Sequence, residues 1–555
     1  MQTDTMRMSL PKRIGEGSQL IKQAVFHTKP TNTPSISLDV TMLSKTEAGV
    51  GVFLFKYIAE NTKKKLPAFW KLSGLYSKGI LDTLTDHGFY KRKEGSALGG
   101  NGAAQSILLI KDNNGIIEQV TPEIIKAYLL ELISAIRVRL PDVDNEDVEL
   151  EVFSSEPALK DLFLKRDHLE VNEKREVSYL QEHQKELLRD SRTHTYILFK
   201  NGVMFIDKNG AQLKPYDDIG EKCVWKHQIH SHELNYLPDE GERAQYAKFL
   251  LNVSGKNNDR YASLITVIGY LVNAYNDPTK SKAVMFYDKE ETDTDNPEGG
   301  TGKGVCVQGV QQVREVVKLD GKNFMKNGQF MWQAINTTTQ AVWIDDPKTS
   351  TPFESFHSVI TDGFNIEKKN QAQIYIRPED SPKLIFTSNS VMIGDGNTNK
   401  RRQFIFEFDG YYKDLQVSGV AEPIASEHNG RFFSSDWDVR EWNLFFSFMI
   451  DATVIYHAYG LKPAPSINVE RNRLIQATNM EFVKWAVQYQ WKHKEPTSEV
   501  FTNFQIFTSD ENTNIGTFSK WVTKYGKSKG VDIGRMVYET KRNYIINTPE
   551  ILTEI

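Results

Sequence analysis

Apolar residues recur every three or four positions along several segments of the chain, and this spacing predicts amphipathic helices. Two such helices are expected in the first half, at Pro122–Leu140 and Asn172–Asp190. Three more are expected at Glu240–Gly255, Arg260–Tyr275 and Asp436–Gly460. The segment Arg260–Tyr275 is apolar on almost every side, so we expect its helix to be buried.

Shorter apolar runs predict strands of two kinds. Around Asn201-Gly202 and Asn209-Gly210, β-branched and aromatic residues alternate with polar ones, and Asn-Gly pairs in this setting indicate hairpins. Further along, four apolar runs predict strands: Lys282–Asp288, Thr339–Asp346, Ser381–Ser390 and Arg401–Tyr412. A helix is expected at Gly304–Val317 after the first run, the second run ends in two carboxylates, and the third ends in polar residues. Strands that end in polar residues are typical of an open α/β sheet that binds its ligand at the carboxyl edge.

These patterns divide the chain into five expected parts. Residues 1–45 are rich in Thr, Ser, Pro and Lys without a clear period, and we expect a flexible arm there. A mixed α+β domain is expected over 46–192, and the hairpins and helices over 193–280. The α/β sheet and its following helices are expected over 281–460. A small unit of helices and strands is expected over 461–555, and it begins with a Pro-bounded linker.

Composition narrows the class of protein. A chain of 555 residues is too long for one core, and 39% hydrophobic with 25% charged residues is ordinary for a soluble globular protein. The net charge of -4 shows no global basic excess, so any nucleic-acid surface must be local. Two cysteines exclude a disulfide framework and a multi-cysteine zinc module. We see no signal-peptide pattern and no apolar run of about 18 residues, so we expect a cytoplasmic protein with no membrane partner.

The stretch "PEGGTGKG", which ends at Gly304, aligns with the phosphate-loop pattern G-x-x-x-x-G-K-S/T. Small residues let backbone N–H groups turn toward phosphates, and Lys303 can reach the terminal phosphates. Pro297 replaces the first glycine, and Gly304 replaces the residue whose hydroxyl is normally a Mg²⁺ ligand. A water or Thr301 could take that place. The candidate nucleotide-binding residues are Glu298, Gly299, Gly300, Thr301, Gly302, Lys303, Gly304 and Val305.

Three further strand ends carry candidate chemistry. Asp345 and Asp346 end an apolar run some forty residues after the lysine, where one carboxylate can hold Mg²⁺ and the other can polarise water. Asn389 ends the next run and is suited to orient water or contact a γ-phosphate. Arg401 and Arg402 precede the fourth run, and an arginine there can reach the γ-phosphate of a neighbouring subunit, with Arg402 slightly preferred.

This order of motifs resembles superfamily 3 helicases, and more narrowly the primase-helicases of phages, plasmids and poxviruses. The resemblance covers roughly residues 193–460 and includes the hairpin and helical segments before the loop. It implies an AAA+-like ATPase core at 281–460 that uses ATP and Mg²⁺, usually a hexameric ring on single-stranded DNA. It also implies a hairpin with a basic residue in the ring's pore, which matches Lys368 and Lys369.

The flanking regions add one basic surface and no second catalytic site. Between Lys520 and Arg542 cations outnumber acids, with aromatic residues interleaved, and this unit weakly resembles a winged-helix-like domain. Its candidate DNA-binding residues are Lys520, Lys524, Lys527 and Lys529. Asp142 and Asp144 lie in a loop-like acidic run that does not indicate a primase. The histidines of "HQIHSH", residues 227–232, are interpreted as a surface cluster and not as a metal site.

The resulting hypothesis is an ATP-dependent DNA helicase or translocase that replicates a phage or other mobile element. It acts on single-stranded or forked DNA as a homo-oligomer, with a primase or polymerase of the same replicon as a further partner. In this hypothesis Lys303 and the glycine loop hold phosphates, Asp345 holds Mg²⁺, Asp346 activates water and Asn389 senses the γ-phosphate. Two alternatives stay open: a nucleotide-dependent DNA-binding initiator or scaffold with little hydrolysis, and an AAA+-like ATPase that acts on RNA or protein.

Overall fold

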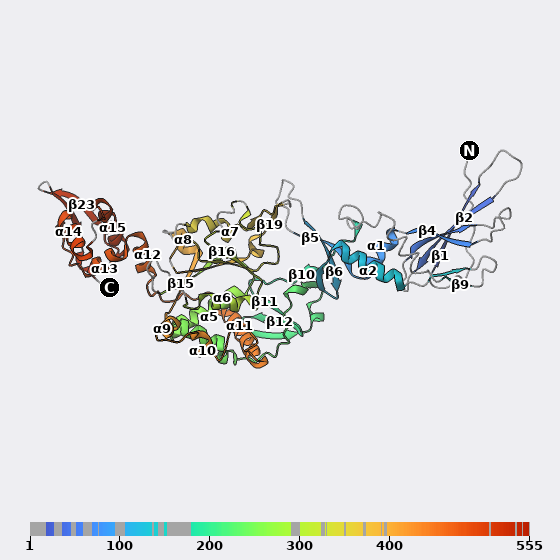
Figure 1. Cartoon of the computed structure of the whole chain (residues 1–555), viewed down its shortest axis with the longest axis horizontal. Coiled ribbons are helices and arrows are strands. Elements are labelled where there is room, and N and C mark those ends of the chain that lie inside the picture. The colour runs from blue at the N-terminus through green and yellow to red at the C-terminus, as the bar shows by residue number, and fades with distance from the viewer. Residues whose placement is uncertain are drawn as a thin grey trace. The chain divides into compact units, whose positions relative to one another are not determined.

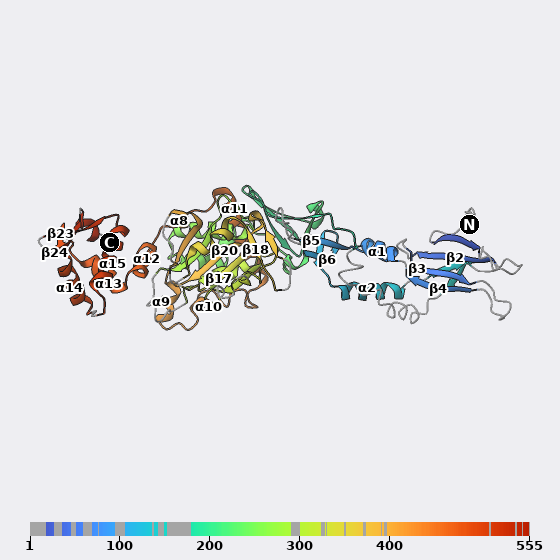
Figure 2. The ribbon, with the colours of Figure 1, turned by 90° about the horizontal axis from the view of Figure 1, so that it is seen from above.

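The fold is described from a computed structural model, shown in Figures 1 and 2, which divides into two compact units. The first unit comprises Met1–Gly95, Gln105–Leu188 and Asp217–His227, and the second comprises Ser96–Ala104, Arg189–Tyr216 and Gln228–Ile555. The residues that the structure describes are 18–26, 36–45, 51–58, 69–75, 77–94, 106–135, 138–141, 149–152, 179–289, 300–323, 328, 330–348, 351–369, 373–389, 391–392, 397–509, 512–538, 541–546 and 548–553.

The first unit is built mainly from strands. One sheet is antiparallel and contains β1 (Ser18–Phe26), β2 (Ile36–Lys45), β3 (Gly51–Ile58) and β4 (Phe69–Leu75) in that order. A second sheet has the order β10-β14-β7-β6-β5, with bounds Glu186–Leu187, Lys222–Trp225, Ile116–Gln119, Ser106–Asn113 and Phe89–Glu94. The unit also contains α1 (Ser77–Asp86), α2 (Pro122–Ala135) and the paired strands β8 (Val138–Pro141) and β9 (Glu149–Val152).

Three expectations for this unit are corrected. Residues 1–45 are not all arm, because β1 and β2 pair with each other as antiparallel strands from Ser18↔Ser44 to Phe26↔Ile36. The expected helix Pro122–Leu140 ends at Ala135, and β8 follows because it pairs with β9. The described part of the expected helix Asn172–Asp190 is not helical, since its backbone bonds instead to Lys91 of β5 and to β14.

The second unit begins with a three-stranded antiparallel sheet and two helices, all expected from the sequence. The strands are β11 (Thr195–Phe199), β12 (Gly202–Asp207) and β13 (Gly210–Lys214), and the Asn-Gly pairs form the two turns. The helices are α4 (Gln245–Val253) and α5 (Asn258–Val272), and almost every residue of α5 is buried. The short segment Asp217–His227, which the sequence grouped with these elements, belongs to the first unit because β14 pairs there.

The centre of the second unit is a five-stranded sheet in which every pairing is parallel. Its order is β16-β17-β20-β15-β21, with bounds Val316–Asp320, Ala341–Asp345, Lys383–Ser388, Ala283–Asp288 and Gln403–Phe408. The four predicted strands are confirmed, and the edge strand β16 was missed. The expected helix Gly304–Val317 is shorter than predicted, because α6 comprises Lys303–Gln311. Val316 and Val317 continue the apolar spacing of the helix but belong to β16 and pair with β17.

Both faces of this sheet are buried, as expected of parallel strands. Side chains of one face, including Phe286 and Trp343, pack with α4, α5, α6 and α11 (Val439–Tyr459), which confirms the long helix predicted there. Side chains of the other face pack with α7 (His357–Thr361) and the hairpin of β18 (Phe364–Ile366) and β19 (Ile374–Ile376). Figure 1 shows α5, α6 and α11 below the sheet and α7 and β19 above it.

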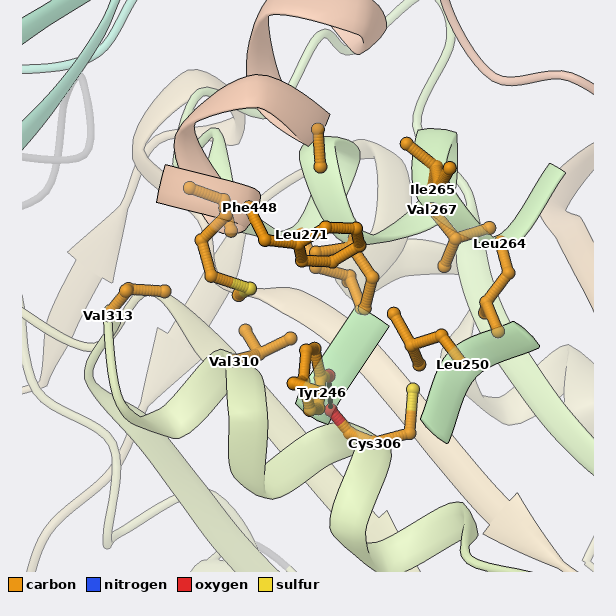
Figure 3. Close-up of a cluster of buried hydrophobic side chains, with 14 of the residues drawn as sticks. Tyr246, Leu250, Leu264, Ile265, Val267, Leu271, Cys306, Val310, Val313 and Phe448 are labelled. Carbon is orange, nitrogen blue, oxygen red and sulfur yellow. Dashed lines mark hydrogen bonds between the residues drawn. The ribbon is translucent and has the colours of Figure 1, made fainter. Parts of the chain in front are cut away.

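Helix α6 is held tightly against α4 in the first of these cores (Figure 3). The hydroxyl of Tyr246 donates to the carbonyl oxygen of Cys306 at 2.8 Å, and both residues are buried. Gly309 permits this approach, because a Cβ at that position would lie 2.3 Å from the Tyr246 hydroxyl oxygen. The start of α6, which carries the predicted phosphate loop, therefore has a fixed position relative to the sheet.

Three short helices flank β21 along the chain: α8 (Asn397–Arg402) precedes it, and α9 (Tyr411–Val417) and α10 (Pro423–Glu427) follow it. A body of helices and strands follows α11. That body contains α12 (Val469–Ala477), α13 (Met480–Gln488), β22 (Lys494–Pro496), α14 (Thr497–Thr508), α15 (Ile515–Ser528), β23 (Ile533–Tyr538) and β24 (Lys541–Ile546). Its sheet has the order β22-β24-β23, and it has an aromatic core of its own. Figure 2 shows its helices α13, α14 and α15 and the hairpin β23–β24 together in one body. Among the helices in the described part of the chain, none has the length and apolar character that crossing a bilayer requires.

Candidate nucleotide site

The start of α6 lies directly after the described part of the predicted phosphate loop. Gly300 and Gly302 have φ values of 115° and 98°, in the left-handed region that favours glycine. Gly302 is also confined by packing, because a Cβ there would lie 2.8 Å from the ring of Phe249. Pro297, Glu298 and Gly299 lie outside the described residues. The described half of the loop therefore has a backbone conformation that requires glycine at these two positions, as the pattern predicts.

Lys303 is the first residue of α6 and is only 8% exposed. Its Nζ lies 2.5 Å from Oδ1 of Asp288, 2.9 Å from Oδ1 of Asn389 and 3.3 Å from Oγ1 of Thr301. Burial lowers the pKa of Lys303, and the nearby carboxylates of Asp288, Asp346 and Asp345 oppose that shift. The structure thus brings the predicted lysine, the predicted asparagine and the acidic pair to one edge of the sheet.

Asp288 is a site residue that the sequence reasoning missed. It is the last residue of β15, is 5% exposed, and accepts hydrogen bonds from Lys303 and from the hydroxyl of Thr301 at 2.5 Å. Its signal in the sequence was an aspartate that ends an apolar run just before the glycine loop, which we interpreted only as a strand end. Asp288 therefore holds the ammonium of Lys303 at the carboxyl edge of the sheet.

Both carboxylates of the acidic pair have lysine partners that the sequence did not indicate. Asp345 ends β17, and its Oδ2 lies 2.7 Å from Nζ of Lys318 on β16. Oδ2 of Asp346 lies 2.6 Å from Nζ of Lys322, just beyond β16. Asp346 has φ 52°, an unusual conformation for a residue with a side chain, and it marks the sharp exit of the chain from β17. The two lysines were missed because β16 itself was missed.

The acidic pair fits the chemistry of magnesium. The side chains of Asp345 and Asp346 are 37% and 45% exposed, so a cation and its waters can reach them. Mg²⁺ usually takes only one or two protein carboxylates and completes its shell with water and phosphate oxygens. Among the described residues there is no group of three or more His, Cys, Asp and Glu side chains that could enclose a metal on its own.

Gly304 supplies no hydroxyl at the position where the phosphate-loop pattern has one. A Cβ added there would meet only the ring of Trp343, at 3.8 and 3.9 Å, which is ordinary contact. Thr301, which we considered as a substitute, donates instead to Asp288. Val305, the next residue of the helix, packs against the core shared by α4, α5 and α11.

The two candidate arginines lie at the end of α8 and differ in exposure. Arg401 is exposed, and Arg402 is partly buried with its guanidinium donating to the carbonyl oxygen of Thr398 at 3.4 Å. Neither has an ion pair with the described residues of the phosphate site. The structure therefore keeps both arginines out of the cluster around Lys303.

The predicted basic hairpin and the basic C-terminal helix are both present as structural elements. Lys368 and Lys369 lie between the antiparallel strands β18 and β19, with Lys369 exposed. Lys520, Lys524 and Lys527 lie on exposed positions of α15, and Lys529 follows its end. The ammonium of Lys524 donates to the carbonyl oxygen of Ala477 at 2.7 Å, so it is committed within the domain.

The histidine segment is a surface cluster only in part, because His227 is exposed whereas His230 and His232 pack against aromatic rings. The ring of His230 packs against Phe199 and Phe446, and burial lowers the pKa of His230 to about 4. The ring of His232 packs against Trp442 with centroids 4.6 Å apart. These rings are aromatic packing elements of the second unit. Asp142 and Asp144 lie outside the described residues.

Comparison with known proteins adds little to this picture. No known protein family and no curated protein matches the chain. Among solved structures, the A form apo structure of the NrS-1 C terminal region is 10% identical, covers 84% of this chain and 99% of that chain, and has a TM-score of 0.37. A structure of Drosophila ORC bound to DNA is 10% identical, covers 58% of this chain and 94% of that chain, and has a TM-score of 0.16.

Proposed function

We propose that this chain binds and hydrolyses ATP and uses the energy to move along DNA as a helicase or translocase. The observation that carries the proposal is the convergence of Lys303, Asn389 and the acidic pair at the carboxyl edge of a parallel sheet, beside a glycine loop that opens a helix. That edge is where open α/β sheets bind their ligands, and a helix N-terminus favours phosphate.

Each residue has a physical task in this proposal. Lys303 exchanges its contact with Asp288 for the terminal phosphates, and the backbone of Gly300–Gly302 surrounds them. Asn389, already bonded to Lys303, is close enough to contact the γ-phosphate or orient water. Asp345 and Asp346 are the residues that would hold Mg²⁺ and orient the attacking water. Bound Mg²⁺ would neutralise charge that develops on the phosphate oxygens.

An arginine from a neighbouring copy would complete the site. The exposure of Arg401 supports its choice over Arg402, whose guanidinium is partly buried and bonded to its own helix. This reverses the preference drawn from the sequence. A ring of copies, hexameric in the family that the sequence resembles, would place each Arg401 against the next subunit's phosphate.

Two basic elements support DNA as the substrate. The exposed Lys369 on the β18–β19 connection is suited to contact a phosphate backbone. The C-terminal body has the order helix, strand, helix, helix, strand, strand from α13 to β24, which supports the winged-helix-like interpretation. In that arrangement, Lys520 and Lys527 on α15 would contact DNA phosphates.

A second candidate function is a nucleotide-dependent DNA-binding initiator or scaffold that hydrolyses ATP slowly. It is favoured by Gly304, which lacks the hydroxyl ligand, and by the ion pair of Asp345 with Lys318. Tight ATP binding with almost no turnover, with or without single-stranded DNA, would support this candidate over the motor.

The test compares the parent with Lys303→Ala in equilibrium ATP binding and in steady-state ATPase assays, with single-stranded DNA, with RNA and without nucleic acid. Lys462→Ala, which removes an exposed lysine elsewhere in the unit, is the matched control. We expect DNA-stimulated hydrolysis in the parent and the control, and loss of both binding and hydrolysis in Lys303→Ala. Equal ATP binding by Lys303→Ala would contradict the proposal, and stimulation by RNA alone would redirect it to an RNA motor.

A further inference from the structure

The missing hydroxyl at residue 304 raises the question of what orients Asp345. Gly304 is the second residue of α6, and the nearest atoms to a Cβ there belong to the indole of Trp343. Trp343 is 3% exposed and lies on β17, two residues before Asp345. The space in front of residue 304 is therefore bounded by an indole ring, and the orienting group must come from elsewhere.

A short hydrogen-bond chain supplies that group. Nε1 of Trp343 donates to Oγ1 of Thr387 at 2.7 Å, and Oγ1 of Thr387 donates to Oδ1 of Asp345 at 2.6 Å. An indole N–H can only donate, and a hydroxyl has a single proton. The hydroxyl must therefore accept from Trp343 and direct its proton at the carboxylate. Chemistry therefore sets the direction of the chain, from Trp343 through Thr387 to Asp345.

The backbone around this chain is rigid. Asp345 and Thr387 are opposite each other in the pairing of β17 with β20, and the amide of Asp346 donates to the carbonyl oxygen of Thr387 at 2.8 Å. Thr387 is only 3% exposed and belongs to a strand whose residues are all buried. Its hydroxyl therefore holds Oδ1 at a fixed place, while Oδ2 is the oxygen that already contacts a cation, the ammonium of Lys318.

We propose that Thr387 is the positioning residue of the metal site: its hydroxyl orients the carboxylate of Asp345 for Mg²⁺. The inference rests on the proposed nucleotide function. Groups that orient a metal ligand without touching the metal typically change metal affinity by about 10- to 100-fold when they are lost.

The first experiment measures Mn²⁺ binding by electron paramagnetic resonance in the presence of a non-hydrolysable ATP analogue. Thr387→Val keeps the shape of the side chain and removes the hydroxyl. We expect Mn²⁺ to bind about 10-fold or more weakly to this variant, and we expect binding of the analogue in excess EDTA to be unchanged. Thr387→Ser keeps the hydroxyl and should retain most of the parent's Mn²⁺ affinity.

A second pair of variants separates positioning from stability. Thr387→Val leaves the buried Trp343 N–H without a partner, which lowers the melting temperature. Trp343→Phe on its own lowers the melting temperature through the cavity it leaves in the core, but it keeps the bond from Thr387 to Asp345, so its Mn²⁺ binding should stay close to the parent's. Thr453→Val, which removes a buried hydroxyl bonded within α11, is the control for loss of a threonine hydroxyl as such.

Parent-like Mn²⁺ affinity in Thr387→Val would overturn the inference and leave the proposed function standing. Mn²⁺ binding as weak in Trp343→Phe as in Thr387→Val would also overturn it, since the effect would then come from lost stability. A parent protein that binds neither the ATP analogue nor Mn²⁺ would overturn the proposed function, and the inference with it.

Discussion

Replacing Lys303 by methionine should destabilise the protein even without nucleotide, because the lysine has a structural partner. Lys303 and Asp288 form a close ion pair whose side chains are 10% and 7% exposed. Methionine keeps the length of the side chain and removes the ammonium, which leaves Asp288 with one neutral donor, the hydroxyl of Thr301. Breaking a buried pair in this way typically costs about 3–5 kcal/mol.

We therefore expect Lys303→Met to lose about 3–4 kcal/mol of unfolding free energy at pH 7. The corresponding fall in melting temperature at pH 7 is roughly 5–10 °C.

The assay is thermal unfolding at pH 7 of the parent, Lys303→Met and the double variant Lys303→Met with Asp288→Asn. The amide removes the buried charge, so the double variant should recover to within about 1 kcal/mol of the parent while ATP binding stays lost. No recovery in the double variant would show that the pair is not the source of the effect. The double variant also isolates the direct role of Lys303 in nucleotide binding from its role in folding.

Three other predictions rest on single contacts. Gly302→Ala should abolish ATP binding and should lower the melting temperature more than Gly419→Ala does. Both glycines have positive φ, but only at Gly302 would the new Cβ lie within 3 Å of an aromatic ring. Equal falls in melting temperature would refute the packing argument. Lys318→Ala removes the ammonium that contacts the carboxylate of Asp345. In a calorimetric titration, the Mg²⁺ concentration that half-saturates the nucleotide complex should therefore fall several-fold. An unchanged or higher Mg²⁺ concentration would contradict this. Burial raises the pKa of Asp451 to about 6, so its ionisation destabilises the folded state as the pH rises through 6. Asp451→Asn should therefore melt higher than the parent at pH 8, with a smaller difference at pH 5.

Much of the second unit could be predicted from local pattern. The Asn-Gly hairpins, the helices α4, α5 and α11 and four strands of the central sheet follow from signals carried by neighbouring residues. The meeting of Lys303 with Asn389 and the acidic pair was also foreseeable, because carboxyl ends of parallel strands share one edge whatever their order.

The tertiary structure alone decided the partners of these residues. Strand order and register depend on pairing between distant segments, so the sequence could not show that β20 lies between β15 and β17 and brings Thr387 against Asp345. The same applies to β16, whose valines fit a helix equally well until β17 pairs with them and sets Lys318 beside Asp345. Local residue patterns determined which elements form and which chemical groups they end in. Non-local backbone pairing, which leaves no periodic trace in the chain, determined which of those groups touch.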